Sequence, residues 1–292
     1  MKNRRPHLVA LLASAAAVTA LAGTAEARQW PLLQDRDVVR MVSFGGSCNG
    51  CELSGRNLSG ASFLGASFTN ASLVGANLRG AELVGSNFSG SDFSRADLRG
   101  VSVVGADFSN ANFSDANLSD ADAQGVRFAG ARLTNVNLSD AGLVGADFTG
   151  ADLRNARMSD AALFGVDLER VNAVGASFVE ASLTNANLSG GDFSRASFRE
   201  AELNGARFGS GRFAGADFTE ASLSRADIRG ADLSRARGLS QDQVSEACGD
   251  SRTRLPRNLQ VNECRGARMR VVTVTPPRPP IPPTPRYFTS LD

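Results

Sequence analysis

Every fifth residue between Leu53 and Leu233 is apolar, and the pattern runs through the chain without a break in phase. The 37 positions hold 18 Leu, 14 Phe and five other residues, which are Val103, Ala123, Met158, Ala173 and Ile228. A period of five matches neither the 3.6-residue period of an α-helix nor the two-residue alternation of a β-strand. Each five-residue unit is therefore expected to form the same short extended piece followed by the same bend.

A second column, of small residues, lies two positions before the first. Ala occupies 26 of its 37 positions, and the consensus unit is Ala-(Asp/Asn/Ser)-(Leu/Phe)-(Ser/Val/Arg)-Gly. Both columns are expected to point inward, and the other three positions are expected to face water. Where Ala123 and Ala173 leave out a large side chain, Val126 and Val171 replace the neighbouring small residue. We interpret this as an exchange of volume within a close-packed core.

A longer period, of four units, is superimposed on the period of five. Two runs show it: Phe68, Phe88, Phe108, Phe128 and Phe148, and Leu58, Leu78, Leu98, Leu118 and Leu138. Four units per coil would stack like residues directly above one another, with backbone groups paired between coils. The 37 units would make a little over nine such coils. At a strand spacing of about 4.8 Å, these coils predict a rod roughly 45 Å long.

The repeat resembles that of the pentapeptide-repeat family, whose consensus is A(D/N)LXX. The clearest matches are Ala76-Asn77-Leu78, Ala96-Asp97-Leu98, Ala151-Asp152-Leu153 and Ala186-Asn187-Leu188. The resemblance covers about two-thirds of the chain. It implies an all-β fold, a right-handed quadrilateral β-helix with four faces. It implies no particular function, because one fold hosts many functions.

Residues 1–27 have the layout of a secretory signal peptide. A basic start is followed by an apolar run from Leu8 to about Ala22, and small residues precede the expected cleavage after Ala27. The apolar run is shorter than the roughly 20 residues needed to span a bilayer. We therefore expect a periplasmic or secreted protein with no membrane span once the signal is removed.

The remaining boundaries follow from where the repeat begins and ends. Ser240 and Gln243 form a capping box that predicts a short helix, which Gly249 is placed to end. Solenoids need their open ends covered, so we expect this segment to act as a C-terminal cap. The tail is rich in proline and is expected to be extended and disordered. The expected division is a signal peptide at 1–27, a lead-in at 28–47, the solenoid at 48–237, the cap at 238–270 and the tail at 271–292.

The four cysteines occur as two pairs that are close in sequence. In an oxidising compartment an even number of cysteines indicates disulfides. Cysteines at opposite ends of a long rod are too far apart to be bridged, which leaves Cys48–Cys51 and Cys248–Cys264. Cys-x-x-Cys is also a redox and zinc motif, but here it lacks a βαβ setting, a nearby His and a second nearby pair.

The composition excludes most catalytic chemistry. The only His and the only Lys, His7 and Lys2, lie in the expected signal peptide, so the mature chain lacks the commonest general base and zinc ligand. The net charge is +1, and it is near −1 once the +2 of the expected signal peptide is removed. A nucleic-acid binder usually carries a clustered basic face, so no nucleic-acid partner is expected. We expect no cofactor and no enzymatic activity.

Three functions are compatible with these features. The first is a structural or interaction scaffold of the cell envelope that binds an unidentified protein partner, and we favour it. The second is DNA mimicry directed at gyrase, as in some members of the family; residues 51–235 hold 22 acidic and 16 basic residues, which is weakly acidic for that role. The third is an enzyme that uses carboxylates alone, for which a convex rod without insertions provides no evident cleft.

One outward column of the coil is apolar. We call it the apolar stripe; it comprises Leu64, Val84, Val104, Val144 and Phe164, with Gln124 interrupting it. A glycine column runs beside it at 65, 85, 105, 125, 145 and 165. Contiguous exposed apolar surface usually marks an interface, so the stripe predicts a protein partner or a homodimer. The alternative is that these residues reflect β-propensity alone.

A second outward column is acidic. We call it the acidic column; it comprises Asp120, Asp140, Asp160, Glu180, Glu200 and Glu220. Carboxylates roughly 5 Å apart repel one another, although Arg157 and Arg199 on the same units could relieve part of this. The column predicts a calcium site, because calcium prefers oxygen ligands, or a basic partner. The alternative is a solvated edge that limits lateral aggregation.

Overall fold

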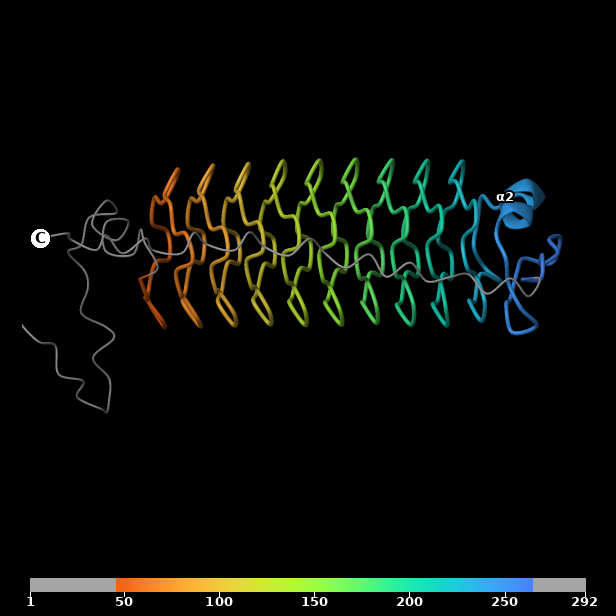
Figure 1. The fold of residues 1–292 in the computed structure, drawn as a ribbon, viewed down its shortest axis with the longest axis horizontal. Coiled ribbons are helices and arrows are strands. Elements are labelled where there is room, and N and C mark those ends of the chain that lie inside the picture. Colours follow the sequence, from red (N-terminus) through yellow and green to blue (C-terminus); the bar gives the residue numbers. More distant parts are fainter. Residues whose placement is uncertain (1–45, 265–292) are drawn as a thin grey trace, which may run out of the picture.

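The computed structural model describes residues 46–264, which form a straight rod of stacked coils (Figure 1). Parallel bridges join the outward residue of each unit to its counterpart four units later, from Ser47 with Ser67 to Asp217 with Arg237. Each coil therefore contains four five-residue units, as the longer period predicts. Each side contributes a single bridged residue rather than a long strand. The expected signal peptide at 1–27, most of the lead-in at 28–47, the last residues of the expected cap at 238–270 and the proline-rich tail at 271–292 lie outside the described residues.

Side chains of the two inward columns fill the interior. All 37 residues of the large column are buried, and their aromatic rings stack between coils. The ring centroids of Phe68 and Phe88 lie 4.9 Å apart, and those of Phe178 and Phe198 lie 5.0 Å apart. The core is therefore a set of side-chain stacks parallel to the rod axis, which a regular coil of four units makes possible.

Glycine replaces alanine in the inward column where an adjacent phenylalanine takes the space. A Cβ atom at Gly191 would lie 2.6 Å from Cε2 of Phe193, and one at Gly211 would lie 2.8 Å from Cε2 of Phe213. A contact this short requires the ring to move. Volume exchange therefore occurs at these positions too, between neighbouring residues of one unit.

The core packing predicts a specific destabilisation. Gly191→Ala should lower the free energy of unfolding by about 1–3 kcal/mol, because overpacking forces the Phe193 ring from its position. The loss should shrink when Phe193→Leu is added. Gly142→Ala is the control, since its Cβ would meet other atoms only at 3.9 Å. Equal losses from Gly191→Ala with and without Phe193→Leu, measured by denaturant unfolding, would contradict this account.

Backbone hydrogen bonds join the coils on every side. The N–H groups of Leu53 and Gly55 donate to the carbonyls of Ser72 and Val74 in the next coil, at 2.7 and 2.9 Å. Ser72 N–H donates back to the carbonyl of Cys51 at 2.8 Å. The same three bonds recur along the rod, so the buried backbone groups are satisfied between coils.

A left-handed residue forms each corner of the coil. Every fifth residue from Gly50 to Gly230 has a φ between +55° and +73°, and 17 of these 37 residues are not glycine. A hydrogen bond closes the turn, as from Ala61 N–H to the carbonyl of Leu58 at 3.1 Å. This is the pattern of a type II β-turn, which needs a positive φ at its third residue. Arginine and glutamate occupy several of these positions despite a cost of about 1–2 kcal/mol for L-residues.

The corners predict two substitutions of opposite sign. Gly145→Ala should lower the free energy of unfolding by about 1 kcal/mol, because an L-residue resists φ +65°. Its Cβ would meet no atom within 4 Å, so the loss reports the backbone alone. Arg95→Gly, at φ +60°, should instead raise the free energy of unfolding by up to about 1 kcal/mol. Thermal unfolding of both variants checks this; a less stable Arg95→Gly variant would refute it.

Helix α2, Gln241–Glu246, follows the last coil and begins with the expected capping box. Ser240 N–H donates to the Gln243 side chain at 2.7 Å, and Gln243 N–H donates to Ser240 Oγ at 3.2 Å. The amide of Gln243 also donates to the carbonyls of Phe218 and Ala221 in the last coil, at 2.9 and 2.7 Å. The capping residue therefore also attaches the helix to the solenoid.

The helix ends earlier than the sequence predicted. Its last residue is Glu246, and Ala247 is already extended, so Gly249 does not end the helix. The reason is that Cys248 forms a parallel bridge with Asp227 and continues the ladder of the solenoid. Pairing with the last coil replaces a further turn of helix.

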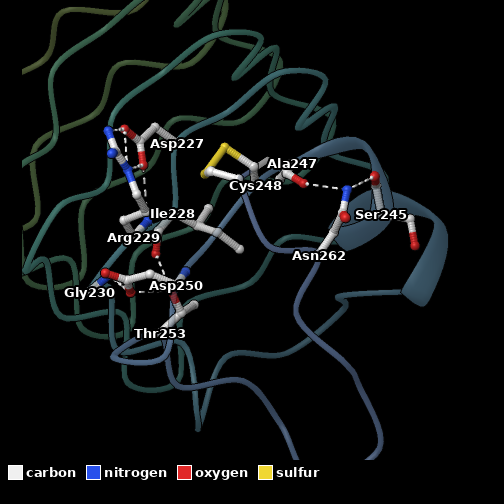
Figure 2. The surroundings of a disulfide bond; sticks show 11 residues. Asp227, Ile228, Arg229, Gly230, Ser245, Ala247, Cys248, Asp250, Thr253 and Asn262 are labelled. Atoms are coloured by element: carbon white, nitrogen blue, oxygen red, sulfur yellow. Dashed lines mark hydrogen bonds and ion pairs between the residues drawn. A yellow bond between two sulfur atoms is a disulfide. The ribbon is translucent and has the colours of Figure 1, made fainter. Parts of the chain in front are cut away.

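Both cysteine pairs form the disulfides expected from the sequence. Their Cα atoms lie 5.4 Å apart in Cys48–Cys51 and 4.8 Å apart in Cys248–Cys264. Figure 2 shows the surroundings of Cys248, where Asn262 donates to the carbonyl of Ser245 at 3.0 Å. The residues that lead to Cys264 are therefore held against the end of the rod.

Asp250 connects this segment to the last coil (Figure 2). Its carboxylate accepts hydrogen bonds from Gly230 N–H at 3.0 Å and from the Arg252 guanidinium at 2.9 Å. Partial burial acts to raise the pKa of Asp250, but these bonds and one from Thr253 outweigh it and lower the pKa to about 2. The ionised carboxylate is thus the form that the folded segment prefers.

A pH dependence follows from this depressed pKa. The stabilisation that Asp250 contributes should be complete above its ordinary pKa of 3.8 and should be lost as the pH falls towards 2. The difference in melting temperature between the parent protein and Asp250→Asn should therefore shrink from pH 5 to pH 2. Scanning calorimetry across this range measures it, and a difference that stays constant would show that the carboxylate charge is irrelevant.

Candidate interaction surface

The apolar stripe and the acidic column border the same face of the rod. In one coil, Asp140 occupies the corner that precedes the face, and Val144 lies at the next corner, four residues later. Between them, Leu143 points into the core and is fully buried. The two columns that the sequence identified separately therefore form the two edges of a single surface.

The apolar stripe is exposed over most of its length. Leu64, Val84, Val144 and Phe164 keep between 36% and 46% of their surface exposed, which makes them the most exposed large apolar side chains among residues 46–264. Val104 is half-buried, and Gln124 interrupts the stripe as expected. Neighbouring coils are in register here, since Gly145 N–H donates to the carbonyl of Phe164 at 2.9 Å.

The glycine column leaves this edge of the rod open. A Cβ atom at any of its positions would meet no atom within 4 Å; the positions are Gly65, Gly85, Gly105, Gly125, Gly145 and Gly165. Each glycine has the positive φ that its corner requires. The other corner columns mix glycine with Asn, Asp, Glu, Ser or Arg, and only this edge has six glycines in succession. The backbone of a bound segment could approach it closely.

Two small residues extend the apolar surface, and the sequence reasoning missed them. Gly142 and Ala162 stand at the outward position that elsewhere carries Asp, Asn, Ser, Glu or Arg, and they are bridged to each other. Beside Val144 and Phe164 they leave this part of the face without polar side chains. Comparing the outward positions coil by coil would have revealed the pair.

The acidic column lies as expected at successive corners. All six carboxylates are exposed, and the coils are joined beside them, as where Asp140 N–H donates to the carbonyl of Ser159 at 3.0 Å. None of the six forms an ion pair within residues 46–264. The expected relief of the column by Arg157 and Arg199 does not take the form of ion pairs among residues 46–264.

The calcium hypothesis receives no support from this geometry. The described part of the chain contains no group of three or more Asp, Glu, Cys or His side chains arranged to hold a metal ion. Each carboxylate belongs to a different coil, about 4.8 Å from the next, and calcium needs six to eight oxygens around one point. Carboxylates spaced in this way along the rod are instead complementary to an extended chain that carries several positive charges.

Eight ion pairs join charged side chains elsewhere among residues 46–264. Arg99 and Arg154 form ion pairs with Asp97 and Asp152, two residues earlier, at 2.6 and 2.7 Å. The hydrogen bonds from these guanidinium groups lower the pKa of both carboxyls. The acidic column takes part in none of the ion pairs among residues 46–264.

No helix within residues 46–264 is both long enough and apolar enough to cross a membrane.

Several solved structures are similar to this chain. One is HetL, a pentapeptide repeat protein involved in heterocyst differentiation regulation in the cyanobacterium Nostoc sp. strain PCC 7120. It is 28% identical over 74% of this chain and 95% of its own, with a TM-score of 0.60. A pentapeptide repeat protein of the Arabidopsis thaliana thylakoid lumen is 32% identical over 39% of this chain and 72% of its own, with a TM-score of 0.27.

The plasmid-mediated fluoroquinolone resistance protein QnrB1 is 19% identical over 70% of this chain and 94% of its own, with a TM-score of 0.27. No curated protein matches the chain. Eight matches to the family of pentapeptide repeats together cover residues 47–237 without a gap. The members of this family fold as right-handed quadrilateral β-helices, as the resemblance of the repeat implied. The chain therefore belongs to the pentapeptide repeat family.

Proposed function

We propose that this protein is a non-catalytic interaction scaffold of the cell envelope. In this role it is exported, its signal peptide is removed after Ala27, and it binds a protein partner in the periplasm or outside the cell. Membership of a family of solenoids supports a scaffold in general terms. The basic and apolar start of the chain supports export.

One observation carries the proposal of partner binding. Leu64, Val84, Val144 and Phe164 are exposed in one line along the rod. A partner that covers these side chains removes their apolar surface from water. Each Å² buried in this way stabilises the complex by roughly 25 cal/mol. The stripe is therefore the surface that gains most from a partner.

We further propose that residues 238–264 cap the C-terminal end of the solenoid. Val244 of α2 is buried, and Arg225 N–H of the last coil donates to the carbonyl of Glu246 at 2.8 Å. These contacts occupy backbone groups that an open end would leave unpaired. The disulfide Cys248–Cys264 would hold the cap closed in an oxidising compartment.

DNA mimicry is the second candidate, and the acidic column is the observation that favours it. Six uncompensated carboxylates in a row resemble the charge of one phosphate strand. The column is confined to one corner, however, and arginines occupy many other positions of the rod. A partner that recognises duplex DNA would meet this charge on one edge only.

The stripe predicts how partner binding and self-association respond to charge. The double variant Val144→Asp/Phe164→Asp should reduce recovery of an envelope partner at least tenfold and abolish any dimer, because two carboxylates would be buried at the interface. Val174→Asp is the matched control, since Val174 is half-buried on a different column. Both should be purified from the exported fraction, with the N-terminus determined by sequencing.

Affinity capture from the envelope fraction and light scattering measure the two effects. Equal recovery and equal mass for the parent, the double variant and the control would refute binding through the stripe. A protein that retains Met1 and stays in the cytoplasm would refute export. Capture of gyrase alone would favour DNA mimicry.

A further inference from the structure

The acidic column and the apolar stripe are the two edges of one face of the rod, which we call the stripe face. Each edge would bind a different kind of chemical group. The acidic column lacks ion pairs within residues 46–264 and calls for cations spaced along the rod. The stripe, four residues away on each coil, calls for apolar groups and allows a backbone to approach its glycines. The complementary ligand is a long, narrow segment with positive charges and apolar residues.

The chain itself contains a segment of this composition at 265–292. The segment carries five arginines and one acidic residue, Asp292, so its side chains have a net charge of +4. The arginines are Arg265, Arg268, Arg270, Arg278 and Arg286. Seven prolines lie between 276 and 285, with Ile281 among them and Tyr287 and Phe288 just beyond. A proline-rich segment loses little conformational entropy when it docks on an apolar surface.

The segment begins where it could reach the face. Cys264, the residue before it, is joined to Cys248, which is bridged to Asp227 in the last coils. The stripe begins at Phe164, about three coils away, which corresponds to roughly 15 Å at the strand spacing. The stretch 265–275 spans roughly 34 Å at the polyproline rise of about 3.1 Å per residue. It is sufficient to cross one corner and reach the stripe.

The direction of the rod suits the segment, because the acidic column and the stripe both extend away from the end near Cys264. Glu220, Glu200 and Glu180 are the carboxylates of the column nearest that end, on the edge of the face opposite the corner that the segment crosses. The proline-rich stretch 276–285 extends about 31 Å. This length matches the roughly 24 Å that the stripe spans over the five coil steps from Phe164 to Leu64. Charge, length and direction therefore agree.

We propose that residues 265–292 fold back along the stripe face of their own chain, with their arginines beside the acidic column and their prolines on the apolar stripe. This rests on the stripe being a contact surface, as in the proposed function, and it adds a control on that surface. The external partner of the proposed function would have to displace the segment to reach the stripe. A protein without residues 265–292 would bind that partner more tightly.

Photo-crosslinking of the full mature chain tests the proposal directly. With p-benzoylphenylalanine in place of Ile281, irradiation should link the segment to peptides that contain Val144 or Phe164, within a single chain. The yield should fall severalfold in Val144→Asp/Phe164→Asp, in Glu180→Gln/Glu200→Gln/Glu220→Gln, and in 1 M salt, where charges are screened beyond about 3 Å. Val174→Asp should leave it unchanged.

Limited trypsin digestion gives a second readout without the photoreactive group. Cleavage after Arg270 and Arg286 should be severalfold faster in the two sets of variants than in the parent and in Val174→Asp. Cross-links to any other face, cross-links between two chains, or cleavage rates that all variants share would overturn the proposal. Two outcomes separate this inference from the proposed function. If no cross-link joins the segment to the stripe, but Val144→Asp/Phe164→Asp still loses the envelope partner, the inference is wrong and the proposed function stands. If the cross-links form but Val144→Asp/Phe164→Asp recovers the partner as well as the parent does, the proposed function is wrong instead.

Discussion

The left-handed corner at every fifth residue is the constraint on which the rest of the structure depends. Because each corner has the same φ near +60°, each coil closes after four units and Leu53 lies beside Leu73. Only this register lets the N–H of Leu53 reach the carbonyl of Ser72. The same register stacks the rings of Phe93 and Phe113 at 4.7 Å. Backbone pairing and core packing thus support each other, as in minimally frustrated sequences.

The polar columns show how a solenoid satisfies its own surface. The carboxylate of Asp92 accepts the N–H of Ser94 at 2.8 Å, which supports the turn. The amide of Asn112 in the next coil donates to the same carboxylate at 3.1 Å. Side chains at the outward position therefore join neighbouring coils as well as their own corners. The stripe face departs from this arrangement at Gly142 and Ala162, so it has surface left for a ligand.

Much of the fold was predictable because a repeat places each residue by its phase. The inward columns, the coil of four units, the disulfide partners and the N-cap of α2 at Ser240 all follow from spacing and local capping rules. The end of α2 did not, because Cys248 pairs with Asp227 of the last coil, which local rules do not describe. Arg157 and Arg199 lie on the same units as carboxylates of the acidic column, yet neither forms an ion pair with the column among residues 46–264. The partner that a long side chain contacts depends on the distances between atoms. The position of a residue within the repeat does not give these distances.

The sequence by itself determined which residues face inward, how many units make a coil and which columns run along the rod, since all three depend only on period. The tertiary structure decided which of those columns are left without partners. Asp97 is paired with Arg99 within its own unit, whereas Asp140 has no ion pair within residues 46–264. The physical reason is that ion pairs and exposure depend on side-chain contacts within and between coils. Those contacts exist only once the coils are stacked.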